Sequence, residues 1–438
     1  MNKFIEALQR ILMPIASGMN KNRYVRAMRD GFVLSLPYTM VGSILTSLFS
    51  LPFLADIMSG TLLAQIKSFV APTTIWSNSI ISLFVVIGIA YSLAKEYKMN
   101  PLHSSMTSVV MFLITCPSFV ADANGTVFNN ALGFSYIGAK AIFSAIIMAI
   151  IGVEVFRWAI NHKLTIKLPD SVPASIQDSF TSFIPAGIAM IVAIIIRQGF
   201  TFTTQGNLTD FIFYWVQAPL SGLALSYPSM LIYGIGINLF WFFGLHGQTM
   251  VGSVFTPFLT ASGTENIEAL AAGQALPNLI NGGYSRAFIA FGFWISVPLL
   301  IALFLYTKKH KRTDWKEVMK ISLIPGLFNI YEPLMFGLPL VLNPFALIPM
   351  LVTPIISHTV AYFLTVAKII PYATGVALPI TTPIGLAGIL ATNSIMAGVV
   401  QVLLMIPLSA MWYFFLSVQD KSERATGVYI EVDDENAV

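Results

Sequence analysis

The stretch Asn329–Gly337, with the sequence NIYEPLMFG, places the carboxylate of Glu332 inside a long apolar region of the chain. A charge at the centre of a membrane helix costs about 2.5–3.5 kcal/mol or more, so such residues are usually retained for function. Pro333 and Gly337 interrupt the helix, and backbone groups freed in this way are tolerated only where they are buried in protein or line a cavity. The stretch therefore predicts a broken membrane segment that carries a substrate site.

The composition is that of a polytopic membrane protein. Of the 438 residues, 56% are hydrophobic and only 10% are charged, and the mean hydropathy is +0.77. A soluble domain carries about 25% charged residues. The net charge of +4 is too small to indicate binding to nucleic acid. The single cysteine, Cys116, excludes an intramolecular disulfide and a multi-cysteine metal site. We expect a buried, inert thiol there, and neither a metal nor a cofactor.

We predict an all-α polytopic fold with about ten transmembrane helices, two re-entrant hairpins and amphipathic interfacial helices. Apolar runs of about 18 residues or more are candidate spans. Two further segments, 319–338 and 369–394, are apolar but rich in Pro, Gly, Thr and Asn, which favours re-entrant hairpins over full crossings. The ten candidate spans lie near 31–54, 72–94, 101–120, 131–156, 180–202, 225–245, 247–264, 285–306, 339–366 and 395–417.

The polar side chains are unevenly distributed along the chain, and this divides it into five regions. The first half holds conventional spans, whereas the broken segments and most intramembrane His, Glu and Asn residues lie in the second half. We therefore predict a scaffold half and a substrate-binding transport half. The five regions are a cytoplasmic amphipathic segment at 1–30, the scaffold at 31–202, an interfacial linker helix at 203–224, the transport domain at 225–417 and a cytoplasmic tail at 418–438.

The basic residues predict the orientation in the membrane. Nineteen of the 24 Lys and Arg residues lie in segments 1–30, 95–98, 157–167, 308–320 and 421–424, between or outside the predicted spans. By the positive-inside rule these segments face the cytoplasm. With ten crossings, both termini are then cytoplasmic.

A set of polar and aromatic residues in the second half forms the candidate site. His246 is flanked by Gly244 and Gly247, which open the backbone, whereas His358 lacks such neighbours and is expected to be a core histidine. One acid, one histidine and several neutral polar groups suit a neutral polyhydroxylated solute held against aromatic rings. Glu332 as a purely structural carboxylate, and the second hairpin as a packed helix, remain open alternatives. The candidate substrate-binding residues are Glu332, His246, Tyr331, Gln248, Trp241, Asn329, Thr381, Thr382 and Asn393.

At these motifs the chain resembles the membrane-embedded enzyme IIC component of the bacterial phosphoenolpyruvate-dependent sugar phosphotransferase system, in its lactose, cellobiose and diacetylchitobiose family. The resemblance extends from the basic N-terminus to residue 417. Its most specific markers are KLPDSVPAS at 167–175, WFFGLHG at 241–247, EPLMFGLP at 332–339 and the pair Asn343-Pro344.

The resemblance implies a homodimer in the bacterial cytoplasmic membrane that carries a β-linked disaccharide similar to cellobiose, diacetylchitobiose or lactose. The sugar-binding and catalytic His and Glu of the family correspond to His246 and Glu332. A separate enzyme IIB, loaded by enzyme IIA, would pass phosphate from a cysteine to the C6 hydroxyl of the sugar. The chain departs from the family pattern at Tyr331, where Asn is usual, and at Ile380, where Trp is usual.

Other classes of protein would use the same pocket differently. A gradient-driven sugar symporter would transport without a phosphoryl donor, and a sugar sensor or receptor would bind without transport. The chain by itself is expected to be a transporter, and to take part in a transferase reaction only when it is paired with enzyme IIB.

Overall fold

The computed structural model describes residues 21–49, 54–121, 126–169, 171–289, 293–338 and 340–425. Most of the predicted N-terminal amphipathic segment, residues 1–20, lies outside these ranges. Within them the fold is helical, apart from one short antiparallel hairpin of β1 (Phe119–Ala121) and β2 (Val127–Asn129), which pairs Val120 with Phe128 and was not predicted.

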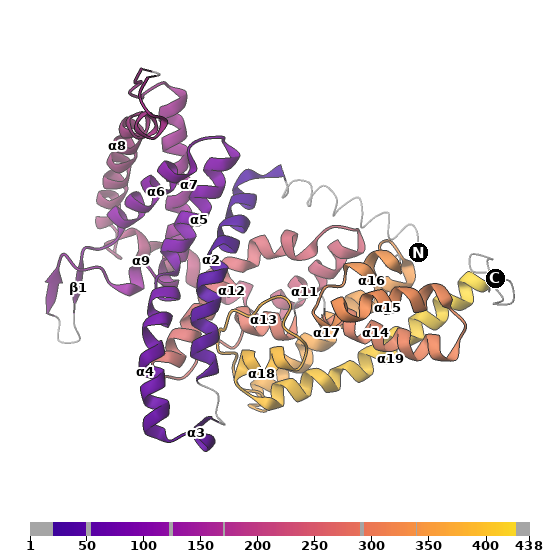
Figure 1. Ribbon diagram of the computed structural model, residues 1–438. Helices are drawn as coiled ribbons and strands as arrows, with labels where there is room; N and C mark the ends of the chain where they lie inside the picture. The colour runs from indigo at the N-terminus through magenta and orange to yellow at the C-terminus, as the bar shows by residue number, and fades with distance from the viewer. Residues whose placement is uncertain are drawn as a thin grey trace.

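The first half of the chain forms an upright group of helices (Figure 1). Helices α2 and α5 approach closely at Gly31 and Gly88, where a Cβ on either glycine would overlap the other helix. Small residues at such contacts let membrane helices pack backbone to backbone. The elements are α2 (Arg23–Leu48), α3 (Leu54–Ile57), α4 (Gly60–Ser77), α5 (Ile81–Glu96), α6 (Pro101–Thr115), η1 (Phe134–Tyr136), η2 (Ala139–Ala141), α7 (Ile142–Asn161) and α8 (Ala174–Thr201).

A bent connection leads to the second half. The region 203–224, predicted as an interfacial linker helix, contains α9 (Leu208–Ile212), a π-helix (Phe213–Gln217) and α10 (Ala218–Ala224), and its interfacial position stays a prediction. The chain then bends by 69° into α11 (Tyr227–Phe242). Pro228 stands in the first turn of α11, where its missing N–H leaves no intrahelical bond unmade.

The second half lies beside the first, and α12 runs between the two groups (Figure 1). Residues 319–338, predicted as a re-entrant hairpin, form the end of α15 and the short α16, which pack against each other. The hairpin at 369–394 is mostly irregular backbone followed by α18. The elements are α12 (Gly247–Ala271), α13 (Gly282–Phe288), α14 (Phe293–Lys309), α15 (Thr313–Leu327), α16 (Glu332–Gly337), α17 (Pro344–Val366), α18 (Leu386–Thr392) and α19 (Ile395–Ala425).

Membrane-spanning helices are identified by length and hydropathy. The described residues contain five helical stretches that are long and apolar enough to cross a membrane, or six if the bent pair 208–224 and 227–242 counts as one span. The predicted crossing at 72–94 lies inside the stretch Gly60–Glu96, where α4 ends at Ser77 and α5 begins at Ile81. The total of ten crossings stays a prediction. The five stretches are Gly60–Glu96, Phe134–Asn161, Ala174–Thr201, Pro344–Val366 and Ile395–Ala425.

Two large hydrophobic clusters form the interior. One contains buried residues from Ala27 to Ile212, together with Ala261 of α12. The other extends from Met230 to Leu416. Apart from Ala261, the first cluster ends at Ile212 and the second begins at Met230. The division into five regions stays a prediction.

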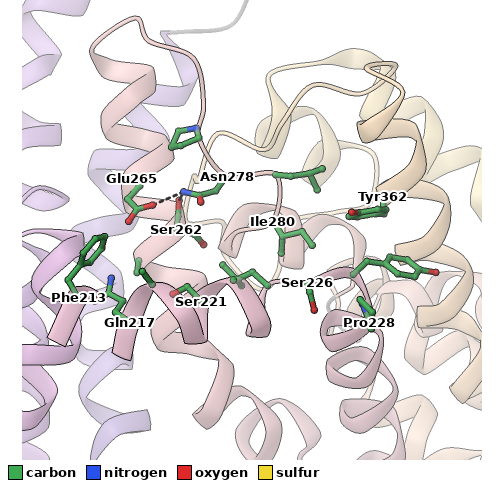
Figure 2. A pocket seen from close by; sticks show the side chains of 17 residues that line it. Phe213, Gln217, Ser221, Ser226, Pro228, Ser262, Glu265, Asn278, Ile280 and Tyr362 are labelled. Atoms are coloured by element: carbon green, nitrogen blue, oxygen red, sulfur yellow. Dashed lines mark hydrogen bonds between the residues drawn. The ribbon is translucent and has the colours of Figure 1, made fainter. Parts of the chain in front are cut away.

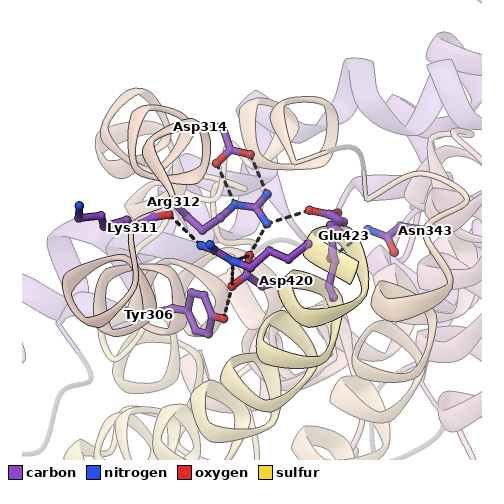
Figure 3. Close-up of polar contacts among 9 residues, drawn as sticks. Tyr306, Lys311, Arg312, Asp314, Asn343, Asp420 and Glu423 are labelled. Carbon is purple, nitrogen blue, oxygen red and sulfur yellow. Dashed lines mark hydrogen bonds and ion pairs between the residues drawn. The ribbon is translucent and has the colours of Figure 1, made fainter. Parts of the chain in front are cut away.

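A buried ion-pair network anchors the end of α19, shown in Figure 3. The tail predicted from residue 418 instead continues α19 to Ala425, because Asp420 binds Arg312 at 2.7 Å and accepts a hydrogen bond from Tyr306 at 2.7 Å. Arg312 also pairs with Asp314 at 2.7 Å and with Glu423 at 2.8 Å. Burial alone would lower the pKa of Arg312, but the bonds to these carboxylates raise it overall.

We expect Arg312→Met to lower the free energy of unfolding by about 3–5 kcal/mol, because removing one partner leaves buried charge uncompensated. The Arg312 side chain is only 2% exposed and that of Asp420 only 4%. Thermal unfolding of the purified protein in detergent measures the loss. The control is Lys320→Met, which breaks an exposed pair with Glu317 and should change stability by less than about 1 kcal/mol. Equal effects of the two substitutions would contradict the anchoring role.

Candidate functional site

His246 lies at the start of α12, at the turn that joins α11 to α12. Gly244 has a φ of +75°, which lets the chain reverse there. The Nδ1 atom of His246 accepts a hydrogen bond from the backbone N–H of Thr249 at 3.3 Å, and lies 2.8 Å from the Thr249 hydroxyl. An Nδ1 atom that accepts from a backbone N–H places the ring proton of a neutral imidazole on Nε2. Nε2 can therefore donate to a ligand oxygen.

Gln248 joins two other predicted site residues, Trp241 and Tyr331, and we call these three residues the Gln248 group. Its Oε1 accepts a hydrogen bond from Trp241 Nε1 at 2.9 Å and another from the Tyr331 hydroxyl at 3.2 Å. The Trp241 ring contacts the His246 ring at 4.8 Å and meets the Tyr331 ring edge to face at 5.0 Å. The Gln248 Nε2 atom is buried without a hydrogen bond to any described residue, so it is a donor suited to a ligand.

Glu332 is adjacent to this group. It is the first residue of α16, and Tyr331 occupies the N-cap position. Its neighbour Tyr331 donates to Gln248, which places Glu332 next to Gln248 and Trp241. The structure thus brings His246, Gln248, Trp241 and Tyr331 into contact with Glu332 beside them, and their binding of substrate stays a prediction.

The remaining predicted residues lie on the two hairpins. Asn329 adopts a left-handed conformation with φ of +65°, and its Nδ2 donates to the backbone carbonyl of Ile380 at 2.7 Å, which joins the two hairpins. The Thr382 hydroxyl is buried and donates to Pro379 O at 2.9 Å. Thr381 is exposed, and Asn393 ends α18. Their contact with substrate stays a prediction.

A cavity of about 420 Å³ adjoins the Gln248 group. It lies between α2, α12, α13 and segment 375–378, so both halves of the chain form its wall. Gln248 and Thr249 line it, together with two cations, Arg29 and Arg286. Among the described residues no carboxylate lines it. Its further polar lining consists of Ser35, Thr39, Asn78, Ser253, Thr256, Thr260, Thr264 and Ser285.

Several lining residues were missed by reasoning from the sequence, and Arg286 is the most informative of them. A signal for it existed, because Arg286 is one of five basic residues outside the predicted cytoplasmic segments. The lining hydroxyls carried no such signal, since Ser and Thr are common at helix contacts in membranes.

A second cavity of about 610 Å³ lies elsewhere (Figure 2). It is formed by the π-helix and α10, the end of α12 and segment 277–280. Glu265 accepts a hydrogen bond from Asn278 at 2.7 Å across it. It contains none of the residues predicted for the site, so the cavity beside Gln248 is the candidate site.

Two other reactive side chains have structural surroundings. His358 is fully buried, with Nδ1 3.1 Å from the Tyr284 hydroxyl and Nε2 3.2 Å from the carbonyl of Tyr227, as expected for a core histidine. Cys116 is 1% exposed and its thiol lies 3.4 Å from Phe112 O. Neither residue adds to the candidate site.

Comparisons with known proteins agree with this geometry. The family model of the phosphotransferase system EIIC matches residues 29–354. The oligo-beta-mannoside-specific EIIC component of Bacillus subtilis is 35% identical, with 95% of this chain and 94% of that protein covered. The cellobiose-specific EIIC component of Geobacillus stearothermophilus is 30% identical, with 97% and 96% covered.

A solved structure has the same fold. The transporter ChbC, the IIC component of an N,N'-diacetylchitobiose-specific phosphotransferase system, superposes with a TM-score of 0.87 at 30% identity, covering 96% of this chain and 99% of that one. The predicted all-helical multi-pass fold is confirmed by this match. The chain belongs to the phosphotransferase system EIIC family, and is a multi-pass protein of the bacterial cytoplasmic membrane.

Proposed function

We propose that the chain is a permease that carries a β-linked disaccharide across the membrane and presents its C6 hydroxyl to a phosphocysteine on a separate enzyme IIB, which enzyme IIA loads. The names of the relatives, with oligo-beta-mannoside and cellobiose among their substrates, support a β-linked glucose or mannose unit. Family membership supports the two partner proteins.

The observation that carries the proposal is the meeting of Glu332, His246 and the Gln248 group beside a polar cavity. Phe32, Leu259 and Leu378 supply apolar wall to the cavity, the rings of Trp241 and Tyr331 pack edge to face next to Gln248, and Gln248 Nε2 supplies a buried donor. Ligand pockets of this kind combine an apolar lining with a few placed polar groups. The cavity volume of about 420 Å³ falls in the range of small-molecule sites.

The chemistry assigned to the site is phosphoryl transfer. The sulfur–phosphorus bond of phosphocysteine breaks as the sugar O6 forms a new bond to phosphorus, and the cysteine departs as a thiolate. Glu332 accepts the hydrogen bond of the C6 hydroxyl and takes its proton, while His246 Nε2 donates to a neighbouring sugar oxygen. Positioning supplies much of the catalysis in this class of reaction, so Glu332 orients the hydroxyl as well as taking its proton, and His246 helps to hold the sugar in place.

The arrangement around the site completes the proposal. The scaffold at 31–202 holds a homodimer together, and the transport domain at 225–417 carries the sugar. Both termini face the cytoplasm, where enzyme IIB has access to the site. The excess of basic residues in the predicted cytoplasmic segments supports this orientation.

Uptake by membrane vesicles tests the function. Labelled cellobiose and β-1,4-mannobiose should accumulate as sugar phosphates only when phosphorylated enzyme IIB is supplied inside. Accumulation of unmodified sugar driven by a proton or sodium gradient would replace the proposal with a symporter. Binding without either product would replace it with a sensor.

We expect Ile380→Trp to tighten cellobiose binding by about 0.5–1.5 kcal/mol, because an aromatic ring beside the Asn329 contact would add a stacking face. The Ile380 side chain is 45% exposed and can be enlarged without displacing the core. Titration of the purified protein with cellobiose measures the change. Ile369→Trp, at a side chain that is 51% exposed on the same segment, is the control. Equal affinities in both variants would place position 380 away from the sugar.

A further inference from the structure

Arg286 is the one intramembrane cation of the cavity that the proposed chemistry does not use. It lies on α13, and its guanidinium lines the cavity beside Gln248. Tyr233 of α11 and Gln248 of α12 line the same cavity. Because Gln248 accepts a hydrogen bond from Tyr331, the cavity that contains Arg286 adjoins the predicted site residues.

The Arg286 side chain has no partner within the described part of the chain. It makes no hydrogen bond or ion pair there. Two other arginines show what a structural arginine looks like in this protein: Arg312 binds three carboxylates, and Arg197 donates to the carbonyls of Ile114 and Cys116 at 2.7 and 2.9 Å. The Arg286 side chain is partly exposed and lines the cavity, so a guanidinium without protein partners there leaves its N–H groups available to a ligand.

The backbone that carries Arg286 is held firmly. Asn281 caps α13 by accepting from Tyr284 N at 3.1 Å, and its Nδ2 donates to Ala373 O at 2.8 Å. At the other end of α13, Gln401 Nε2 donates to Ala287 O at 2.6 Å. These bonds hold α13 against the backbone at Ala373 and against α19. Because the backbone is held in this way, only the rotamers of the Arg286 side chain have to be ordered when a ligand binds.

We propose that Arg286 anchors the sugar by donating two hydrogen bonds to adjacent oxygen atoms of the substrate. The planar guanidinium presents paired N–H groups in a fixed fork, which matches two neighbouring oxygens. Neutral hydroxyl and ring oxygens of a glycoside satisfy this geometry. The inference rests on the proposed function and adds a specificity residue on α13 to the groups on α12 and α16.

The test measures affinity and ligand-free stability in the full-length protein purified in detergent. Cellobiose and β-1,4-mannobiose are titrated into the unaltered protein and into Arg286→Gln, Arg286→Lys and Arg26→Gln. Arg26 pairs with Glu96 at 2.6 Å and does not line the cavity, so its variant is the matched control.

We expect Arg286→Gln to weaken disaccharide binding by about 10- to 100-fold, which is the strength of hydrogen bonds to a charged group. The affinity of Arg286→Lys should fall between those of the unaltered protein and Arg286→Gln, because an ammonium keeps the charge but lacks the paired N–H groups of the guanidinium. Arg26→Gln should bind as the unaltered protein does. Without sugar, Arg286→Gln should melt at the same temperature as the unaltered protein or higher, since the substitution removes an unpaired, partly exposed charge and breaks no bond to the described residues.

The outcomes separate this inference from the proposed function. If neither disaccharide binds to the unaltered protein, the proposed function fails and the inference fails with it. If the unaltered protein binds and Arg286→Gln binds equally well, only the inference is overturned. If Arg286→Lys binds the disaccharides as tightly as the unaltered protein but melts at a lower temperature without sugar, Arg286 has a structural role. That result also overturns the inference.

Discussion

Replacing Glu332 with Gln is expected to lower sugar phosphorylation by about 10²- to 10⁴-fold, the contribution of a positioned general base. Gln has nearly the same shape as Glu, but it cannot accept the proton of the C6 hydroxyl. Glu332 is partly buried at the start of α16, beside the Gln248 group. The substitution also removes a buried charge, so the fold should be retained.

The measurement uses membranes that contain the variant, phosphorylated enzyme IIB and labelled cellobiose or mannobiose, and follows the sugar phosphate formed. Thermal unfolding of the purified variant shows whether the fold is intact. Glu317→Gln is the matched control, because Glu317 lies on α15 with a side chain that is 63% exposed. It should retain normal turnover. Near-normal phosphorylation by the Glu332 variant would reduce Glu332 to a structural group.

Replacing Gly375 with Ala is expected to destabilise the protein by about 2–6 kcal/mol, from backbone strain together with overpacking. Gly375 has a φ of +87°, a conformation that residues with a Cβ rarely adopt. A Cβ there would also overlap the backbone carbonyl of Gly263 on α12. Because segment 375–378 lines the cavity, the displacement should weaken sugar binding as well.

Gly273→Ala separates the two causes. Gly273 has a φ of +67°, but a Cβ there would meet no atom within 4 Å. Its variant therefore carries the conformational cost alone, about 1–3 kcal/mol. Thermal unfolding in detergent and titration with cellobiose compare the two variants. If Gly375→Ala costs no more than Gly273→Ala, the close contact between segment 375–378 and α12 does not constrain the cavity.

Much of the fold could be predicted because its signals are local. Hydropathy identified the apolar segments, and Pro333 in the run around Glu332 indicated a break in the helix. His246 could be selected because two glycines flank it. The limits of the individual helices were harder to predict. The run at 72–94 is continuous in hydropathy, yet it contains the end of α4 and the start of α5, since hydropathy does not report where hydrogen bonding stops.

The sequence by itself determined the membrane class and selected Glu332 and His246 as candidate reactive groups, whereas the cavity beside them is lined by both halves of the chain. Only the tertiary structure decided that Gln248 connects Trp241 with Tyr331, which lies 83 positions away. It also placed Arg286 in the cavity that Gln248 lines. The Thr382 hydroxyl donates to Pro379 O in its own segment. The physical reason is that hydropathy and helix breakers act over a few residues, whereas the cavity is built by contacts between distant helices.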